Sequence, residues 1–263
     1  MESLAITEFP PEIETFDMAI TVATLEERVN SHIKWFKSAI AAGFAWLAVL
    51  SLLLYNIHTD VRNVAVAQAD APAKFVATLL SQPQTSSSAL ASNLNAASTI
   101  LRTSKIGKVK PESSVLSTVS LKLAEAQTKY PDLPEVWQTT GVFITYKSEA
   151  RLPLSLNTPF LNSWAACKVQ AGGIGWVFSN CEVTLEDIAE RIKGSTLNGS
   201  PAPFTFIHCM VHYSGGRIPA KQLTFADCNF SFQVPVVPPR EGMAVMRQLT
   251  IAPDQNNIVL LLG

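Results

Sequence analysis

The chain holds four cysteines, and each lies in the same local pattern: an aromatic residue, two variable residues, the cysteine, one variable residue and an apolar residue. Cysteine can bind metals or form disulfides, so this pattern is the first place to look for chemistry. No CxxC pair occurs, which argues against a zinc site or a redox site. The residues of the four copies are Trp164, Cys167 and Val169; Phe178, Cys181 and Val183; Phe206, Cys209 and Val211; and Phe225, Cys228 and Phe230.

The repetition indicates a regular backbone path with an inward-facing ladder of side chains. Residues two apart on a strand share a face, so each cysteine shares a face with the apolar residue after it. The aromatic residue lies three positions before the cysteine, which places the two on opposite faces of a straight strand. Both point inward only if a corner separates them. The pattern therefore predicts pairs of short strands joined by corners, with successive pairs stacked on one another.

The segment Phe225-Ala-Asp-Cys-Asn-Phe230 resembles the corner of pentapeptide-repeat proteins and right-handed parallel β-helices. The resemblance is local, because the five-residue rule does not continue around whole coils and the copies start unevenly, at residues 164, 178, 206 and 225. It implies a C-terminal β-solenoid over residues 151–263. An antiparallel β-sandwich of hairpins is the alternative fold. Both folds place turns at Gly172-Gly173 and Gly215-Gly216.

Stacked strands would bring neighbouring cysteine Cα atoms to about 4.8 Å from each other, within the range for a disulfide. A Cys181–Cys209 or Cys209–Cys228 bridge would then form in an oxidising compartment. The other interpretation is a ladder of small buried thiols, since a free cysteine packs as a compact hydrophobe.

Other side chains give weaker signals for chemistry. With Cys209 inward, His208 and His212 are predicted to share the outer face, but no third metal ligand is evident. Solvent-exposed charged side chains on a β-helix could act on glycans; the candidates are Asp227, Glu182, Lys168 and Arg217. Their spacing does not distinguish them from ordinary surface residues, and no catalytic motif is present. We therefore predict no catalytic residues, no metal and no cofactor.

The segment Ser38–Ile57 contains no charged residue. As a helix it spans about 30 Å, the thickness of a bilayer's hydrocarbon core, and aromatic residues flank both ends. A polar leader precedes it, which favours an uncleaved anchor over a signal peptide. Arg28, Lys34 and Lys37 on one side, against Arg62 on the other, favour a cytoplasmic N-terminus and an external C-terminal domain.

The remaining regions divide by composition. Residues 1–18 are predicted as a flexible acidic tail, 19–37 as an amphipathic juxtamembrane helix and 58–150 as a linker and helical neck. The juxtamembrane helix would pair with copies of itself or lie on the membrane surface. In the neck, helices are expected over Ala89–Thr103, Val115–Tyr130 and from Pro134 to about Gly141, while Val142–Tyr146 suits a strand as well as a helix. The neck would serve as an oligomerising stalk, as a lid, or as a cap over open strand edges.

The C-terminal region also shows elements between and after the repeats. A short inserted helix is predicted at Thr184–Ser195, a helix at Met243–Leu249 and a strand at Asn257–Leu262.

Net charge is −1 and no basic cluster is visible, which argues against a nucleic-acid-binding face. The sequence therefore predicts an α+β, membrane-anchored, single-pass protein without enzymatic activity, whose β-solenoid is a platform for binding or self-assembly. The alternatives are a membrane effector or pore-like oligomer with a ligand-sensing solenoid, and a surface enzyme acting on glycans. The expected partners are the lipid bilayer, further copies of the chain, and a protein or glycan ligand.

Overall fold

The computed structural model describes residues 12–83, 86–104, 106–107, 109–151, 168–172, 175–188, 203–252 and 258–262. Side chains are described from residue 24 onward, except those of residues 151 and 168–172. The chain forms two compact units, Met1–Arg62 and Asn63–Gly263. Helices and two open β-sheets are both present, as the α+β prediction requires.

A long helix, α1, runs from Glu12 to Ser81. It is long and apolar enough to cross a membrane, and none of its most apolar window is buried. A helix of this kind near the N-terminus also suits a signal sequence. Residues 12–18 are helical, contrary to the flexible tail predicted there, and the helix continues through the first part of the predicted linker at 58–81.

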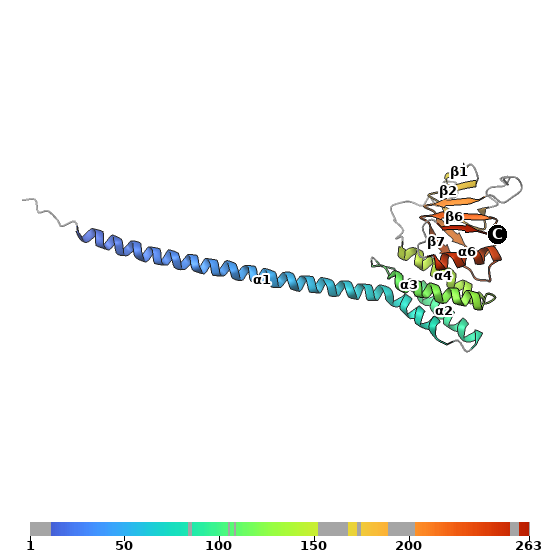
Figure 1. Ribbon diagram of the computed structural model, residues 1–263, viewed down its shortest axis with the longest axis horizontal. Coiled ribbons are helices and arrows are strands. Elements are labelled where there is room, and N and C mark those ends of the chain that lie inside the picture. Colours follow the sequence, from blue (N-terminus) through green and yellow to red (C-terminus); the bar gives the residue numbers. More distant parts are fainter. Residues whose placement is uncertain are drawn as a thin grey trace, which may run out of the picture. The chain divides into compact units, whose positions relative to one another are not determined.

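Three shorter helices pack with the last turns of α1 in the second unit (Figure 1). They are α2 (Ser87–Thr103), α3 (Ser113–Lys129) and α4 (Pro134–Arg151), which correspond to the three helices predicted for the neck. Apolar side chains spaced three or four residues apart line their shared core. The core residues are Ala73, Val76, Leu90, Leu94, Ala97, Leu101, Val119, Leu123, Ala126, Val136, Val142, Phe143 and Tyr146.

Helix α4 is buried on both sides. Trp137 and Ile144 belong to the core of the sheets, whereas Val136, Phe143 and Tyr146 belong to the core of the helices. The strand considered for Val142–Tyr146 is therefore wrong, because α4 continues unbroken to Arg151. Because α4 buries side chains on two sides, it has no single apolar stripe, and its sequence lacks the usual helical signal.

Two sheets follow α4 in the chain. The first has strand order β1-β2-β4-β6-β8 and the second β3-β5-β7. Their bounds are β1 Lys168–Gly172, β2 Gly175–Ser179, β3 Glu182–Thr184, β4 Phe204–Ile207, β5 Met210–Tyr213, β6 Gln222–Ala226, β7 Asn229–Phe232 and β8 Ile258–Leu261.

Pairing is parallel from β2 to β4 to β6 and from β3 to β5 to β7. Phe178, Phe206 and Phe225 are aligned in the first sheet. Val183, Val211 and Phe230 are aligned in the second. Equivalent residues of three copies of the cysteine pattern are thus stacked in register, which the antiparallel β-sandwich would not produce. Because both sheets are open, the solenoid stays a prediction.

In each of the three copies whose corner is described, the predicted corner lies at one residue. Asn180, His208 and Asp227 immediately precede the cysteines, and their φ angles are 55°, 53° and 52°. This left-handed conformation disfavours most side chains, and Asn, Asp and His are the non-glycine residues most enriched in it. The chain bends there, and the cysteine returns to the interior.

The first copy of the pattern departs from the other three. Its Val169 lies in β1, which runs antiparallel to β2, so Val169 is paired with Phe178 instead of being stacked on Val183. Trp164 and Cys167 lie outside the described residues.

Two further elements complete the unit. Helix α6 (Arg240–Ile251) buries Val245, Met246 and Leu249 in the core of the sheets, and β8 pairs antiparallel with β6. They correspond to the helix and strand predicted near the C-terminus. Most of the helix predicted at Thr184–Ser195 lies outside the described residues.

Candidate functional site

The repeated residues form the interior of the sheets. Phe178, Phe206 and Phe225 are stacked with 5.3 Å between successive ring centroids. The aromatic, cysteine and apolar residues of these three copies are all buried. A ligand has no access to this ladder, so its role in the structure is to hold neighbouring strands in register.

The three described cysteines differ in their bonding state. Cys209 and Cys228 are free thiols, while Cys181 is disulfide-bonded to a partner outside the described residues. The Sγ atoms of Cys181 and Cys209 are 3.8 Å apart, in hydrogen-bonding contact, and are not joined by a disulfide. Since Cys209 and Cys228 are both free thiols, neither bridge considered from the sequence is present. A hydrogen bond between Cys209 and Cys228 lowers the pKa of Cys209 and raises that of Cys228.

The two histidines of the sheets, His208 and His212, lie in different structural positions. His212 Nε2 lies 2.6 Å from Glu182 Oε1 across neighbouring strands. His208 occupies a corner, as does Asp227 in the next copy. Among the residues whose side chains are described, no group of three His, Cys, Asp or Glu is placed to hold a metal ion.

Helix α4 closes the edge of the second sheet through hydroxyl groups. The backbone amide of Phe232 donates to Thr145 Oγ1 over 2.8 Å, and that of Phe230 donates to Ser148 Oγ over 2.9 Å. Gly141 lies one turn earlier, where a Cβ atom would be 3.3 Å from the carbonyl oxygen of Phe232. The face of α4 formed by Gly141, Thr145 and Ser148 therefore approaches β7 closely and satisfies two amides that an open strand edge leaves unpaired.

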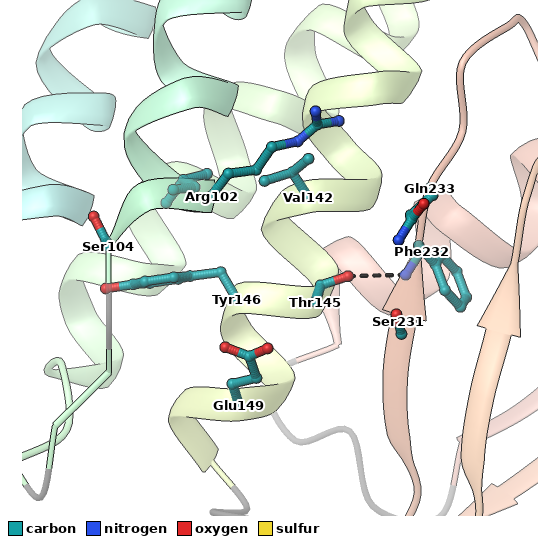
Figure 2. Close-up of a pocket in the computed structure, with 10 residues that line it drawn as sticks. Arg102, Ser104, Val142, Thr145, Tyr146, Glu149, Ser231, Phe232 and Gln233 are labelled. Atoms are coloured by element: carbon teal, nitrogen blue, oxygen red, sulfur yellow. Dashed lines mark hydrogen bonds between the residues drawn. The ribbon is translucent and has the colours of Figure 1, made fainter. Parts of the chain in front are cut away.

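A polar pocket of about 330 Å³ opens beside this joint (Figure 2). Its walls come from the end of α2, one face of α4 and the end of β7. The lining residues are Leu101, Arg102, Ser104, Val142, Thr145, Tyr146, Glu149, Ser231, Phe232 and Gln233. In Figure 2, Arg102 and Glu149 lie towards opposite ends of the pocket, with Tyr146 and Thr145 between them.

Burial changes the acidity of two lining groups. Partial burial raises the pKa of the Glu149 carboxyl above its ordinary value. Burial and, secondarily, the Asp70 carboxylate raise the pKa of the Tyr146 phenol. Tyr146 therefore stays neutral at physiological pH, and Glu149 changes charge at a higher pH than an exposed glutamate does.

Asp70 is itself held in place. It is almost fully buried, accepts a hydrogen bond of 2.7 Å from the amide of Glu112, and forms an ion pair of 3.0 Å with Lys74. These contacts link the C-terminal part of α1 to the start of α3. The buried Asp70 carboxylate, which acts on Tyr146, is therefore both ion-paired and hydrogen-bonded.

Sequence reasoning did not find this pocket. Its residues come from three segments distant in the chain, 101–104, 142–149 and 231–233, and none of them forms a motif. The one available signal was the placement of Gly141, Thr145 and Ser148 on one face of a helix. That pattern indicates that another backbone packs closely against the helix, and it does not indicate a ligand.

The described lining residues of the pocket offer one guanidinium, one carboxyl group, one side-chain amide, four hydroxyls and two aromatic rings. The pocket can bind a polar molecule by hydrogen bonds at several positions.

Comparison with known proteins identifies no relative: no family model matches the chain, and no curated protein or solved structure shows significant similarity to it.

Proposed function

We propose that this chain is a single-pass membrane protein without enzymatic activity, whose C-terminal unit is a short, capped β-solenoid that binds a hydroxyl-rich ligand such as a glycan. The observation that carries the proposal is the polar pocket between Arg102 and Glu149, built beside the joint of α4 and β7.

The solenoid is supported by strand register and corner geometry together. Strands β2 and β3, β4 and β5, and β6 and β7 form three consecutive pairs, each joined through one left-handed residue. Backbone hydrogen bonds continue from coil to coil at the corners, with Asn180 N donating to Ile207 O and His208 N to Ala226 O, over 3.0 and 2.9 Å. This is the arrangement expected of stacked coils.

Ligand binding is favoured over end-to-end assembly of the solenoid. Thr145 and Ser148 occupy the amides of β7 that a second copy would need for pairing. At the corresponding edge of the first sheet, β8 pairs with β6. When both edges of the stack are covered in this way, a partner can bind only to its side surfaces or to a cavity in them.

Membrane anchoring is supported by the apolar stretch of α1, in which large side chains such as Trp46, Leu50 and Leu54 are exposed. Exposed apolar surface on this scale is unfavourable in water and favourable in a bilayer. The cytoplasmic N-terminus is supported by the basic residues before the span, and an external C-terminal unit by the disulfide of Cys181, since disulfides persist in oxidising compartments.

The test is binding of the full-length protein, reconstituted in nanodiscs, to an array of glycans. We expect retention of a defined subset, and loss of that retention on Arg102→Ala or Glu149→Gln. The matched control is Glu125→Gln, which removes an exposed carboxylate on α3 that forms an ion pair with Lys122. Failure to retain any glycan, or equal retention by all four proteins, would exclude the pocket as a glycan site.

A further inference from the structure

The three described cysteines place a free thiol directly beside a disulfide in the interior of the sheets. Cys209 Sγ lies 3.8 Å from Cys181 Sγ. Cys181 is disulfide-bonded to a partner outside the described residues and so carries no thiol proton, which makes Cys209 the donor in this contact. The thiol of Cys209 is therefore directed at one sulfur atom of an existing disulfide.

The strand pairing brings these two cysteines to a separation that a disulfide can span. Cys181 immediately precedes β3 and Cys209 immediately precedes β5, and these strands are parallel neighbours. The amide of Met210 donates to the carbonyl oxygen of Cys181 over 2.9 Å, which holds the two backbones together at this point. Neighbouring strands lie about 4.8 Å apart, and disulfides join Cα atoms about 4.4–6.8 Å apart. A bond between Cys181 and Cys209 therefore requires rotation of side chains and no displacement of strands.

Cys228 acts on the Cys209 thiol from the next copy of the pattern. Its hydrogen bond to Cys209 lowers the pKa of Cys209 and raises the pKa of Cys228. Because the thiolate is the nucleophile in thiol–disulfide exchange, this arrangement makes Cys209 the attacking thiol and keeps Cys228 protonated. Cys209 is also buried, so dissolved thiols and oxidants do not reach it in the folded protein.

We propose that Cys209 exchanges with the disulfide of Cys181 within the folded protein, so that the chain interconverts between two disulfide isomers. The Cys209 sulfur attacks Cys181 Sγ, and the bond between Cys181 and its present partner breaks. The electron pair of that bond leaves with the partner's sulfur, which takes up the proton that Cys209 gives up. One S–S bond forms and one breaks, so the step consumes no oxidant and no reductant. The proposal does not depend on the glycan site.

The second isomer differs from the first in what its disulfide holds together. A Cys181–Cys209 bond adds a covalent link to the backbone hydrogen bonds between β3 and β5. It also releases a thiol in another part of the chain. The exchange is thus a covalent switch that fixes the stacking of two copies of the pattern.

The experiment follows the disulfide link in the full-length protein, reconstituted in nanodiscs and incubated at pH 8 without reductant. Samples are quenched in acid, alkylated with N-ethylmaleimide in guanidinium and digested for mass spectrometry. Cys167 is the fourth cysteine of the sequence, so we expect a Cys181–Cys167 link at the start. A Cys181–Cys209 link should then appear with time. The number of alkylated thiols per chain should stay constant, and Cys228 should be alkylated throughout.

Three variants separate the nucleophile from its neighbour. Cys209→Ser should leave the link of Cys181 unchanged at all times. Cys228→Ala removes the hydrogen bond to Cys209, so exchange should slow about threefold at pH 8 and its pH profile should move to higher pH. Cys228→Ser keeps a donor at that position and should restore most of the rate. Thermal unfolding of each variant establishes that it is folded.

A fourth variant tests the geometry apart from the exchange rate. In Cys167→Ser, mild oxidation with diamide should join Cys181 to Cys209 and leave Cys228 free. Failure to form this bond would overturn the geometry on which the proposal rests.

Three results with the unaltered protein would overturn the proposal. The first is a Cys181 link that does not change during incubation. The second is a mixture of all links, those of Cys228 included, which would mean that the disulfide rearranges through unfolding. The third is a link between isotope-labelled and unlabelled chains, which would mean that the exchange occurs between molecules.

Discussion

The hydroxyl oxygen of Thr145 accepts a hydrogen bond of 2.8 Å from the backbone amide of Phe232, 87 residues later in the chain. This bond joins the helical layer to the last strand of the second sheet, and it lies at the wall of the polar pocket (Figure 2). It accounts for the position of a threonine, a residue with only modest helical propensity, in the middle of α4.

Removal of this acceptor should destabilise the protein. Thr145→Val keeps the side-chain shape and leaves the Phe232 amide unsatisfied, at an expected cost of about 1–3 kcal/mol in the free energy of unfolding. Ser148→Ala should have a similar effect through the Phe230 amide. Denaturant unfolding measures both, with the exposed Thr118→Val on α3 as the control. Equal stability of all three variants would show that the joint contributes nothing.

The corner residues make a second prediction. Val at His208 must adopt a φ near 53°, which costs a β-branched residue at least about 1–2 kcal/mol, whereas Gly adopts it without strain. We therefore expect His208→Val to lower the unfolding midpoint and His208→Gly to leave it near that of the unaltered protein. The same order should hold at Asp227. The control is Thr224→Val, which places the same side chain on a regular strand. A corner at which Val is as stable as Gly would contradict the left-handed geometry.

The thiols should differ in reactivity. Cys209 and Cys228 are free but about 1% exposed, so iodoacetamide should modify neither in the native protein and both in guanidinium. Cys181 should be modified only after reduction of its disulfide. Peptide mass spectrometry without and with reductant distinguishes the three. Modification of Cys181 in guanidinium without reductant would show that it has no disulfide.

The Glu149 carboxyl should make stability depend on pH. Burial raises its pKa, so the folded state favours the protonated form. Its stabilising contribution is present below the unfolded pKa and is lost as pH rises through the folded pKa. Glu149→Gln should therefore raise the unfolding midpoint slightly at pH 7 relative to the unaltered protein, and the difference should vanish near pH 4. The exposed Glu125→Gln should show no such trend.

Membrane insertion should fail when the apolar span carries charge. Leu47→Arg together with Leu50→Arg should release the protein from membranes at alkaline pH, since each arginine at the centre of a span costs about 2.5–3.5 kcal/mol. The control is Val236→Arg, an exposed position in the second unit. Retention of the double variant in the membrane fraction would mean that residues 38–57 do not anchor the chain.

The fold was predictable from the sequence for those strands and helices that bury a single face, because their apolar residues recur at short, regular spacings. The repeated pattern predicted two strands and a corner in each copy, and Phe178, Phe206 and Phe225 are aligned as that pattern requires. The corner follows from parity alone: inward residues three apart need a bend, and Asn180, His208 and Asp227 supply it. The helices at Ser87–Thr103 and Ser113–Lys129 likewise follow from apolar spacing.

The pattern misled where two strands that are consecutive in the chain pair with each other. Val169 follows its cysteine as Val183 does, yet β1 turns back beside β2 and pairs with it antiparallel. A local pattern specifies which face of a strand is apolar, and that face is buried equally well in either strand direction.

The amino-acid sequence by itself determined the apolar helix, the stacked repeats and their corners, because each depends on spacings of two to five residues. Only the tertiary structure decided that Val142–Tyr146 is helical, that Thr145 and Ser148 close the edge of β7, and that a polar pocket opens beside α4. Those features depend on contacts between segments about a hundred residues apart, whose free energy exceeds the weak local preferences that a periodic pattern records.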